Sequence, residues 1–294
     1  MTNKWTIRGG GVYNPAPFSI FGIVNVTPDS FYDGGSHHGA ADAVAHAKRL
    51  VADGVHVLDL GAESSRPFAP PVSLDEELAR LVPVMEGLAE YAYDAQSTLP
   101  LQPYAEGPLL SVDTYKAATA VAALEAGAHI INDISACAFD PTLRDVVAQY
   151  RAGYVLMHSQ GKPETMQIAP RYDNVVDDIL AFFEREMTAM VKAGLPEEYI
   201  VLDVGIGFGK TMDQNYTILQ NMERFASLGR PLFMGLSNKS LFSDLLGVPK
   251  DGRQCATQVA TALLAARGVA YHRVHDVAAT AQTLKLVSAM QSLY

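Results

Sequence analysis

Polar side chains recur where apolar, strand-like runs of this sequence end. Asp113, Asn132 and Asp203 each close such a run, and His158 closes another. A buried polar group costs a few kcal/mol unless it is paired, so two carboxylates and an amide that converge are expected to meet a ligand. A flat heterocycle with several N–H donors and a carbonyl suits them. Any one of these residues alone is explained as well by a helix cap, and His158 alone by a structural hydrogen bond, but three residues on separate strands favour a binding site.

Four residues that form cations also follow strand-like runs, and the sequence predicts that they share one anion site: Arg66, Lys239, Arg273 and His275. The planar guanidinium of arginine matches phosphate oxygens. A single arginine is as readily a solvated surface residue, so the prediction rests on their joint placement.

Two other patterns suggest chemistry less strongly. Residues 205–210 (GIGFGK) resemble a phosphate-cradling loop, but neither the Walker spacing nor the dinucleotide fingerprint is present, and the glycines also suit a tight turn beside a ligand. Asp59 and Glu63 form a carboxylate pair of the kind used in glycoside hydrolysis, although Trp5, the only tryptophan, leaves few aromatic platforms for a sugar. Cys137 and Cys255 have no partners at metal-ligand spacing, which argues against a structural zinc site.

Strands and helices must position these residues, and the sequence alternates between the two. Short runs rich in Val, Ile, Leu and Phe predict strands covered on both faces, at 19–24, 55–60, 109–112, 129–132, 153–157, 199–202, 231–235 and 269–274. Helical spacing lies between them, at 39–53, 74–91, 115–126, 141–150, 174–192, 215–227, 254–267 and 277–292. This alternation predicts an α/β fold, a (β/α)8 TIM barrel in a single domain over residues 1–294. A doubly wound open sheet is the alternative, because alternation alone does not prove closure.

Local signals mark where two of the helices begin. Ser73, with Glu76 three residues later, predicts a capping box before the helix at 74. Asp140 before Pro141 predicts an N-cap with proline at the first helical position.

Composition limits the classes of partner. The chain has 294 residues, is 49% hydrophobic, and carries 22 basic and 32 acidic side chains for a net charge of −10. That supports a full hydrophobic core and argues against a general nucleic-acid binder. Two cysteines suggest a reducing compartment. The first ten residues do not resemble a signal peptide, and no apolar run reaches the ~18–20 residues of a membrane span. We expect a soluble, cytoplasmic protein that binds neither nucleic acid nor membrane.

Taken in order, the motifs after the strands resemble the dihydropteroate synthase family, a group of pterin-binding barrels inhibited by sulfonamides. The resemblance covers residues 20–277, and one motif falls at each strand end: 22–31 (GIVNVTPDSF), 63–67 (ESSRP), 111–116 (SVDTYK), 131–135 (INDIS), 157–158 (MH), 205–210 (GIGFGK), 235–240 (GLSNKS) and 273–277 (RVHDV).

The resemblance implies a reaction of folate biosynthesis. 6-Hydroxymethyl-7,8-dihydropterin pyrophosphate would lose pyrophosphate as the amine of 4-aminobenzoate attacks its exocyclic carbon. The pterin would be bound by Asp113, Asn132, Met157, Asp203, Phe208, Gly235, Lys239 and Arg273. Pyrophosphate would be bound by Asn25, Arg66, Arg273 and His275, with Mg²⁺ on Asn25, and aminobenzoate by Phe31, Ser65, Pro67 and Ser237. The residues expected to carry catalysis are Asn25, Arg66, Asp113, Lys239 and Arg273. The family is usually homodimeric.

The sequence departs from the family pattern in three loops. Asn238 stands where the family usually has arginine, Val204 replaces proline, Ser65 replaces threonine, and glycines are replaced by Ala62 and Phe68. These departures keep open a pterin-binding protein without synthase activity. A pterin-dependent methyltransferase is the other alternative, but it needs neither the 25–31 loop nor the anion site. The loops 26–35 and 61–71 are rich in glycine, proline and serine, and we expect both to be mobile when empty.

Overall fold

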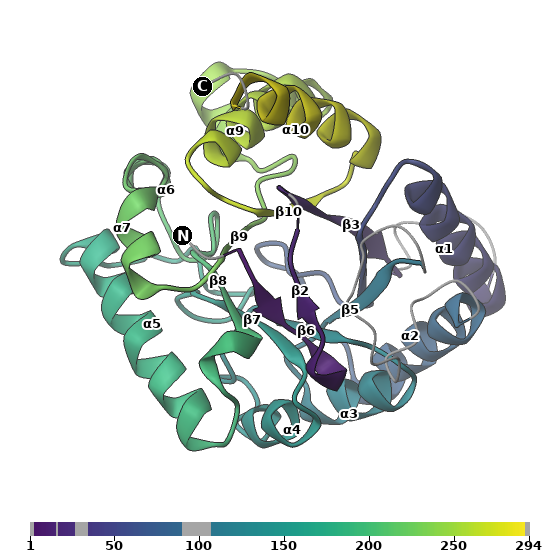
Figure 1. Cartoon of the computed structure of the whole chain (residues 1–294). Helices are drawn as coiled ribbons and strands as arrows, with labels where there is room; N and C mark the ends of the chain where they lie inside the picture. Colours follow the sequence, from purple (N-terminus) through teal and green to yellow (C-terminus); the bar gives the residue numbers. More distant parts are fainter. Residues whose placement is uncertain (1–2, 16, 27–34, 90–106, 292–294) are drawn as a thin grey trace.

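A closed parallel barrel forms the centre of the structure (Figure 1). The structure is a computed structural model that describes residues 3–15, 17–26, 35–89 and 107–291. Within them, eight strands pair in the order β10-β3-β4-β5-β6-β7-β8-β9. Their bounds are β3 (Ser19–Asn25), β4 (Val57–Gly61), β5 (Leu109–Asp113), β6 (Ile130–Asp133), β7 (Gly153–Met157), β8 (Ile200–Asp203), β9 (Leu232–Met234) and β10 (Tyr271–Val274). The predicted (β/α)8 barrel is confirmed, and the open-sheet alternative is wrong because β10 pairs with β3.

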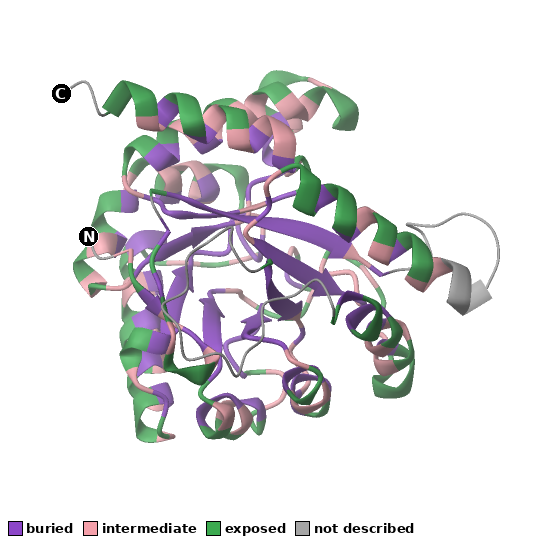
Figure 2. Ribbon diagram, turned by 45° about the vertical axis from the view of Figure 1, so that its right-hand side comes forward, coloured by how far each residue is buried: buried purple, intermediate pink, exposed green. Residues whose placement is uncertain are grey.

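Helices surround the barrel and turn their buried faces toward it (Figure 2). They are α1 (Gly35–Ala52), α2 (Leu74–Leu88), α3 (Ala117–Glu125), α4 (Leu143–Tyr150), α5 (Val175–Lys192), α6 (Met212–Gln220), α7 (Met222–Phe225), α8 (Leu241–Leu246), α9 (Gln254–Ala266) and α10 (Val277–Gln291). The predicted helix 215–227 is interrupted at Asn221, and α8 lies where no helix was predicted. Among the described residues, no helix is long and apolar enough to cross a membrane.

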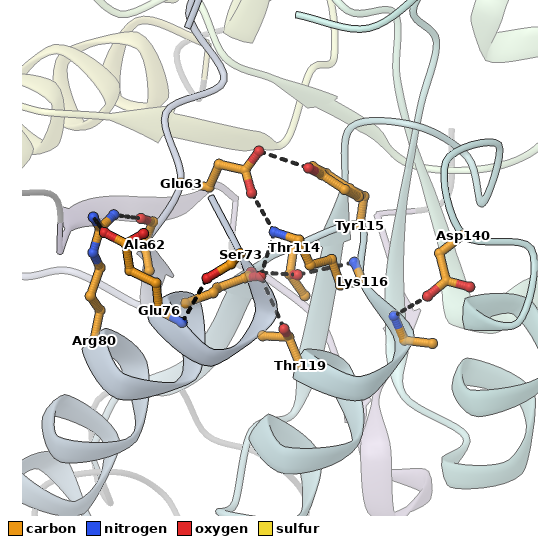
Figure 3. Close-up of polar contacts among 12 residues, drawn as sticks. Ala62, Glu63, Ser73, Glu76, Arg80, Thr114, Tyr115, Lys116, Thr119 and Asp140 are labelled. Carbon is orange, nitrogen blue, oxygen red and sulfur yellow. Dashed lines mark hydrogen bonds and ion pairs between the residues drawn. The ribbon is translucent and has the colours of Figure 1, made fainter. Parts of the chain in front are cut away.

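The two predicted helix starts have different outcomes. Ser73 caps α2 as expected, because its hydroxyl accepts a hydrogen bond from the backbone N–H of Glu76 at 3.3 Å. The N-cap prediction for Asp140 is wrong, since α4 begins only at Leu143. The Asp140 carboxylate instead accepts from the backbone N–H of Thr142 (3.1 Å) and of Ala117 (2.8 Å), so it joins the turn before α4 to the start of α3 (Figure 3).

A short N-terminal hairpin, β1 (Trp5–Thr6) and β2 (Val12–Tyr13), packs against one end of the barrel. The indole of Trp5 is buried, donates to the carbonyl of Tyr199 at 2.7 Å and meets Tyr271 edge-on at 5.4 Å between ring centroids. The sequence analysis did not predict this hairpin. Its apolar side chains close the end of the barrel opposite the strand ends that carry the polar residues.

Side chains inside the barrel change from apolar to polar along the strand direction. An apolar cluster shared with the hairpin contains one inward residue from every strand: Phe21, Val57, Leu109, Ile130, Val155, Val201, Phe233 and Tyr271. Because strand side chains alternate with a period of two, the residues two positions later also face inward. They are Ile23, Asp59, Ser111, Asn132, Met157, Asp203, Gly235 and Arg273. The polar site therefore lies directly above the apolar layer, at the carboxyl ends of the strands.

Candidate active site

Asp59 is the polar centre of the barrel interior. It is fully buried, and its carboxylate accepts hydrogen bonds from Ser111 Oγ (2.5 Å), Asn132 Nδ2 (3.1 Å) and Arg273 Nε (2.6 Å). The same guanidinium donates from Nη2 to Asp113 Oδ2 at 2.8 Å. Residues from four strands are thus joined in one network. Asp113 and Asn132 thus converge on one mouth, and Arg273 together with Asp59 links them.

The surroundings of Asp113 raise the pKa of its carboxyl group. Burial raises the pKa of Asp113 to about 7, and the neighbouring charge of Asp59 adds to the rise while Arg273 opposes it. For Arg273 the carboxylates outweigh burial, which by itself lowers the pKa, so its pKa is raised above the usual value and the guanidinium stays charged. Asp113 is therefore the group in the network that changes charge near neutral pH.

The segment after β8 is a tight turn built around a buried lysine. Asp203 Oδ1 accepts from the backbone N–H of Gly205 at 2.8 Å. The ammonium of Lys210 is buried, donates to the carbonyls of Gly205 and Phe208 at 2.9 Å each, and lies 3.0 Å from His158 Nδ1. Since these backbone contacts hold Lys210 inside the protein, the GIGFGK segment acts as a turn and not as a phosphate cradle.

Glycine is required at the first position of that turn. Gly205 has φ +66°, and a Cβ there would lie 1.9 Å from the carbonyl oxygen of His158. Gly235, at the end of β9, is different: a Cβ would meet only Arg273, at 3.9 Å. The backbone at Gly235 therefore leaves an open surface toward the interior of the mouth.

Apolar side chains form one wall of the mouth. Met157 and Phe208 are buried in a cluster with Ile134 and Met166. Lys239 Nζ lies 4.3 Å from the centroid of the Phe208 ring. Burial lowers the pKa of Lys239 to about 8, although the charge of Asp203 opposes that change. A flat apolar surface thus lies beside Asp203 and a lysine, as a planar polar heterocycle requires.

The remaining predicted cations lie toward the rim. His275 Nδ1 is 2.9 Å from the hydroxyl of the buried Ser237. Desolvation, then the charges of Arg273 and Arg66, lower the pKa of His275 to about 4, so this ring is neutral at pH 7. Arg66 is exposed in the segment after β4. The charges of Lys239 and Lys250 lower the pKa of His275 as well, and the anion site itself stays a prediction.

The other predicted site residues have mixed outcomes. Asn25 is half-buried at the carboxyl end of β3, paired in register with Gly61 of β4. Ser65 is half-buried and Pro67 is exposed in the segment after β4. Phe31 lies outside the described residues, as do positions 27–34 of the loop expected to be mobile. Within the described ranges no group of three or more His, Cys, Asp or Glu side chains is placed to hold a metal ion.

The sequence analysis considered Asp59 only as a carboxylate pair with Glu63 and Lys210 only as part of the GIGFGK segment, and it assigned neither residue to the network seen here. The signal for Asp59 was present, because it is the one charged residue within the apolar run 55–60. Its role depends on contacts with Asn132 and Arg273, 73 and 214 positions away, and these appear only in the fold. For Lys210, the burial of the ammonium is decided by three backbone carbonyls that converge on it.

Two departures from the family pattern adopt a backbone conformation that favours glycine or asparagine. Phe68 has φ +64°, and its backbone N–H donates to the carbonyl of Pro163 at 2.9 Å. A left-handed conformation costs a non-glycine residue about 1–2 kcal/mol. Asn238 has φ +56°, which asparagine tolerates well, and its carbonyl accepts from Arg253 Nη1 at 2.9 Å. Neither departure removes a residue of the interior network.

Known proteins resemble this chain along almost its whole length. The family model described as "Pterin binding enzyme" matches residues 21–275. Dihydropteroate synthase of Escherichia coli strain K12 is 37% identical over 273 residues, which are 93% of this chain and 92% of that protein.

Two solved structures of Xanthomonas albilineans dihydropteroate synthase are also similar. The one with 4-aminobenzoic acid is 38% identical, with a TM-score of 0.86 and 99% of both chains covered. The one in complex with 7,8-dihydropteroate is 36% identical, with a TM-score of 0.83, and the match covers 98% of this chain and 99% of that one.

Proposed function

The chain belongs to the family of pterin binding enzymes, and on that premise we infer that it catalyses the dihydropteroate synthase reaction of folate biosynthesis. The amine nitrogen of 4-aminobenzoate forms a bond to the exocyclic carbon of 6-hydroxymethyl-7,8-dihydropterin pyrophosphate. The carbon–oxygen bond breaks, pyrophosphate leaves with the electron pair, and the amine releases a proton. One observation supports this function most directly: Asp113, Asn132 and Asp203 lie at the same mouth of the barrel, beside the apolar cluster of Met157 and Phe208.

The pterin binds, in this proposal, between the polar row and the apolar wall. Asp113, Asn132 and Asp203 face its N–H groups and carbonyl, and Lys239 lies beside them. Met157 and Phe208 contact one side of the ring, and Gly235 leaves room for it. Asp113 is paired with Arg273 in this structure. When the pterin binds, the Asp113 carboxylate therefore has to release Arg273 and accept hydrogen bonds from the ring N–H groups. The Arg273 guanidinium then packs on the face of the pterin ring.

Pyrophosphate binds on the rim side of the same mouth, near Arg66, Arg273 and His275. The two guanidinium groups supply charge and paired N–H donors. When the hydroxyl of Ser237 donates to Nδ1 of His275, the Nε2 nitrogen carries the hydrogen and donates to a phosphate oxygen. The histidine thus contributes a neutral hydrogen bond in addition to the arginine charges.

Asn25 fits a Mg²⁺ ion that is bound chiefly by the substrate. Its side-chain amide oxygen, at the end of β3, is a hard ligand of the kind Mg²⁺ accepts. We propose that the pyrophosphate oxygens provide most of the other ligands. Bound there, the ion would neutralise charge on the leaving pyrophosphate. Tight binding of Mg²⁺ to the enzyme without substrate is therefore not expected.

The aminobenzoate site follows from the two segments beside the pyrophosphate. We propose that Ser65 and Pro67 of the segment after β4, with Ser237 after β9, line it, together with Phe31. An aromatic amine is uncharged at pH 7, so the attacking nitrogen needs no strong general base. The chain's contribution to this step is to position the amine and to exclude water.

The homodimer of the family is consistent with an exposed apolar face. Helices α9 and α10 pack against each other on one side of the barrel (Figure 1). Four large apolar side chains on them are more than half exposed: Val259, Leu263, Leu286 and Met290. We propose that a second copy of the chain covers this face. The cytoplasmic location stays a prediction.

A coupled assay for pyrophosphate release tests the function. With pterin pyrophosphate, 4-aminobenzoate and Mg²⁺ present, we expect pyrophosphate and dihydropteroate in equal amounts. Omission of Mg²⁺ should remove most of the activity. Pterin binding without aminobenzoate-dependent turnover would contradict the synthase and favour a pterin-binding protein without this activity.

A further inference from the structure

A partly buried ion-pair network lies between the segment after β4 and the turn after β5 (Figure 3). Glu63 accepts a hydrogen bond from Tyr115 OH at 2.7 Å on one carboxylate oxygen and forms an ion pair with Lys116 on the other. The Lys116 ammonium also lies 2.7 Å from Glu77 Oε2. We call these four residues, Glu63, Glu77, Tyr115 and Lys116, the Glu63 network.

The network is anchored on the side of α2 and α3. Glu77 is 1% exposed, and its carboxylate also accepts from Thr114 Oγ1 (2.7 Å) and Thr119 Oγ1 (3.0 Å). The hydrogen bonds to Glu63 and Glu77 outweigh burial, which alone lowers the pKa of Lys116, and raise it above its usual value, so the ammonium stays charged. Glu77 and Lys116 are thus held in place by α2 and α3, and Glu63 is the member of the network that lies in the segment after β4.

The segment that carries Glu63 is held at both ends. At its start, Arg80 of α2 donates to the carbonyl of Ala62 at 2.7 Å, and Glu63 is held by Tyr115 and Lys116. At its far end, the N–H of Phe68 donates to the carbonyl of Pro163. Ser65, Arg66 and Pro67 lie between these points. Their positions therefore depend on where Glu63 is fixed.

The other side of the network reaches the pterin pocket. Thr114, Tyr115 and Lys116 directly follow Asp113, the last residue of β5. The ring of Tyr115 meets Phe139 edge-on at 5.2 Å and packs against the apolar cluster that contains Met157 and Phe208. Tyr115 therefore contacts both the apolar cluster of the proposed pterin pocket and Glu63 in the segment after β4.

We propose that Glu63 is a positioning residue for the aminobenzoate step: its contacts with Tyr115 and Lys116 place Ser65–Pro67 against the pterin pocket. This proposal rests on the proposed function, because it assigns the aminobenzoate site to that segment. A fixed loop lowers the conformational entropy that aminobenzoate binding must otherwise supply. Loss of the Glu63 contacts therefore weakens aminobenzoate binding and leaves the pterin contacts on β5, β6 and β8 in place.

Glu63→Gln is the main test. The amide keeps the shape and can still accept from Tyr115, but its NH₂ group faces the ammonium of Lys116, so the charge-assisted contact is lost. We expect KM for 4-aminobenzoate to rise about tenfold and KM for pterin pyrophosphate to change less than about twofold. Tyr115→Phe removes one hydrogen bond and keeps the ring packing, so KM for aminobenzoate should rise about threefold.

Glu186→Gln is the matched control. Glu186 is 16% exposed, close to the 12% of Glu63, and pairs with Arg144 between α5 and α4, away from the mouth. Its KM values should equal those of the wild type. An unchanged KM for aminobenzoate in Glu63→Gln, or equal rises in both KM values with a lower melting temperature, would overturn the positioning role. If Glu63→Gln does not fold, Tyr115→Phe decides by the same KM ratio. A wild type without aminobenzoate-dependent turnover would instead refute the proposed function.

Discussion

Asp59 shows how one buried carboxylate orients two functional side chains. Its desolvation is offset by three donors, from Ser111, Asn132 and Arg273. Removal of this carboxylate would leave the Asn132 amide and the Arg273 guanidinium without a shared partner. Asp59 therefore positions residues of the proposed pterin site, whereas Asp113 stands at the mouth, where burial raises the pKa of its carboxyl group.

Pterin affinity should fall as the pH falls. With a pKa of about 7, Asp113 is mostly ionised at pH 8 and mostly protonated at pH 6, and the pterin N–H groups need the ionised acceptor. Calorimetric titration of a dihydropterin should show about a tenfold loss of affinity across that range. Asp113→Asn and Asp203→Ala should each bind more than about tenfold more weakly at pH 8. If Asp113→Asn kept the wild-type pH dependence, another group would control it.

Arg273→Ala should reduce kcat/KM more than Arg66→Ala. Arg273 is paired with Asp59 and Asp113 and serves both substrate parts in the proposed site, while Arg66 is exposed and serves the pyrophosphate alone. Loss of a charged hydrogen bond lowers kcat/KM about ten- to a hundredfold. We therefore expect Arg66→Ala to lower kcat/KM within that range and Arg273→Ala to lower it further. Steady-state kinetics with both variants measure the difference. Equal losses would argue against a double role for Arg273.

The turn after β8 and the end of β9 use glycine for different reasons. At Gly205 the positive φ and the His158 carbonyl exclude a side chain, whereas at Gly235 the protein leaves space. Gly205→Ala should lower the melting temperature by several degrees, because strain of about 1–3 kcal/mol enters the folded state. Gly235→Ala should keep the wild-type melting temperature and bind pterin more weakly. Thermal scans and pterin titrations of the pair separate the two effects.

The loop after Asn25 is expected to order around the anion, and this determines the sequence of binding. The segment after β4, expected from its sequence to be mobile, is held at Ala62, Glu63 and Phe68, so only Ser65 and Arg66 between these points have to adjust. Aminobenzoate has one carboxylate and few other polar groups, so it cannot readily offset the cost of ordering the first loop. We expect pterin pyrophosphate to bind first. In calorimetry, 4-aminobenzoate should bind tightly only after Mg²⁺, pyrophosphate and a pterin are added, and equal affinity for the free enzyme would refute this order.

At the scale of the whole molecule, the exposed apolar face on α9 and α10 predicts a dimer. Light scattering should give twice the mass of the chain. Leu263→Glu and Leu286→Glu place charges at two apolar positions that are more than half exposed, and both should shift the protein toward a monomer. Val191→Glu, an exposed position on α5, is the control and should stay dimeric. A monomeric wild type would contradict the assignment of this face.

The sequence by itself determined the barrel and the polar layer of its mouth. Apolar runs that alternate with helical spacing specify strands buried on both faces, and the two-residue period places Asp113, Asn132 and Asp203 on the inside of three different strands. The strand and helix patterns are local, so they can be read from neighbouring residues. The N-cap prediction at Asp140 failed because its carboxylate also accepts a hydrogen bond from α3, a contact that the local sequence does not show.

Only the tertiary structure decided which side chains meet. The contacts of Asp59 with Arg273 and of Glu63 with Lys116 join residues 214 and 53 positions apart, and the burial of Lys210 depends on carbonyls brought together by the turn after β8. The N-terminal hairpin was missed for the same reason, since Trp5 is stabilised by Tyr199 and Tyr271 and not by its neighbours in sequence. Hydrophobic patterns specify which face of a strand is buried, but ion pairs and packing across the barrel depend on closure, which brings distant strand ends within contact distance.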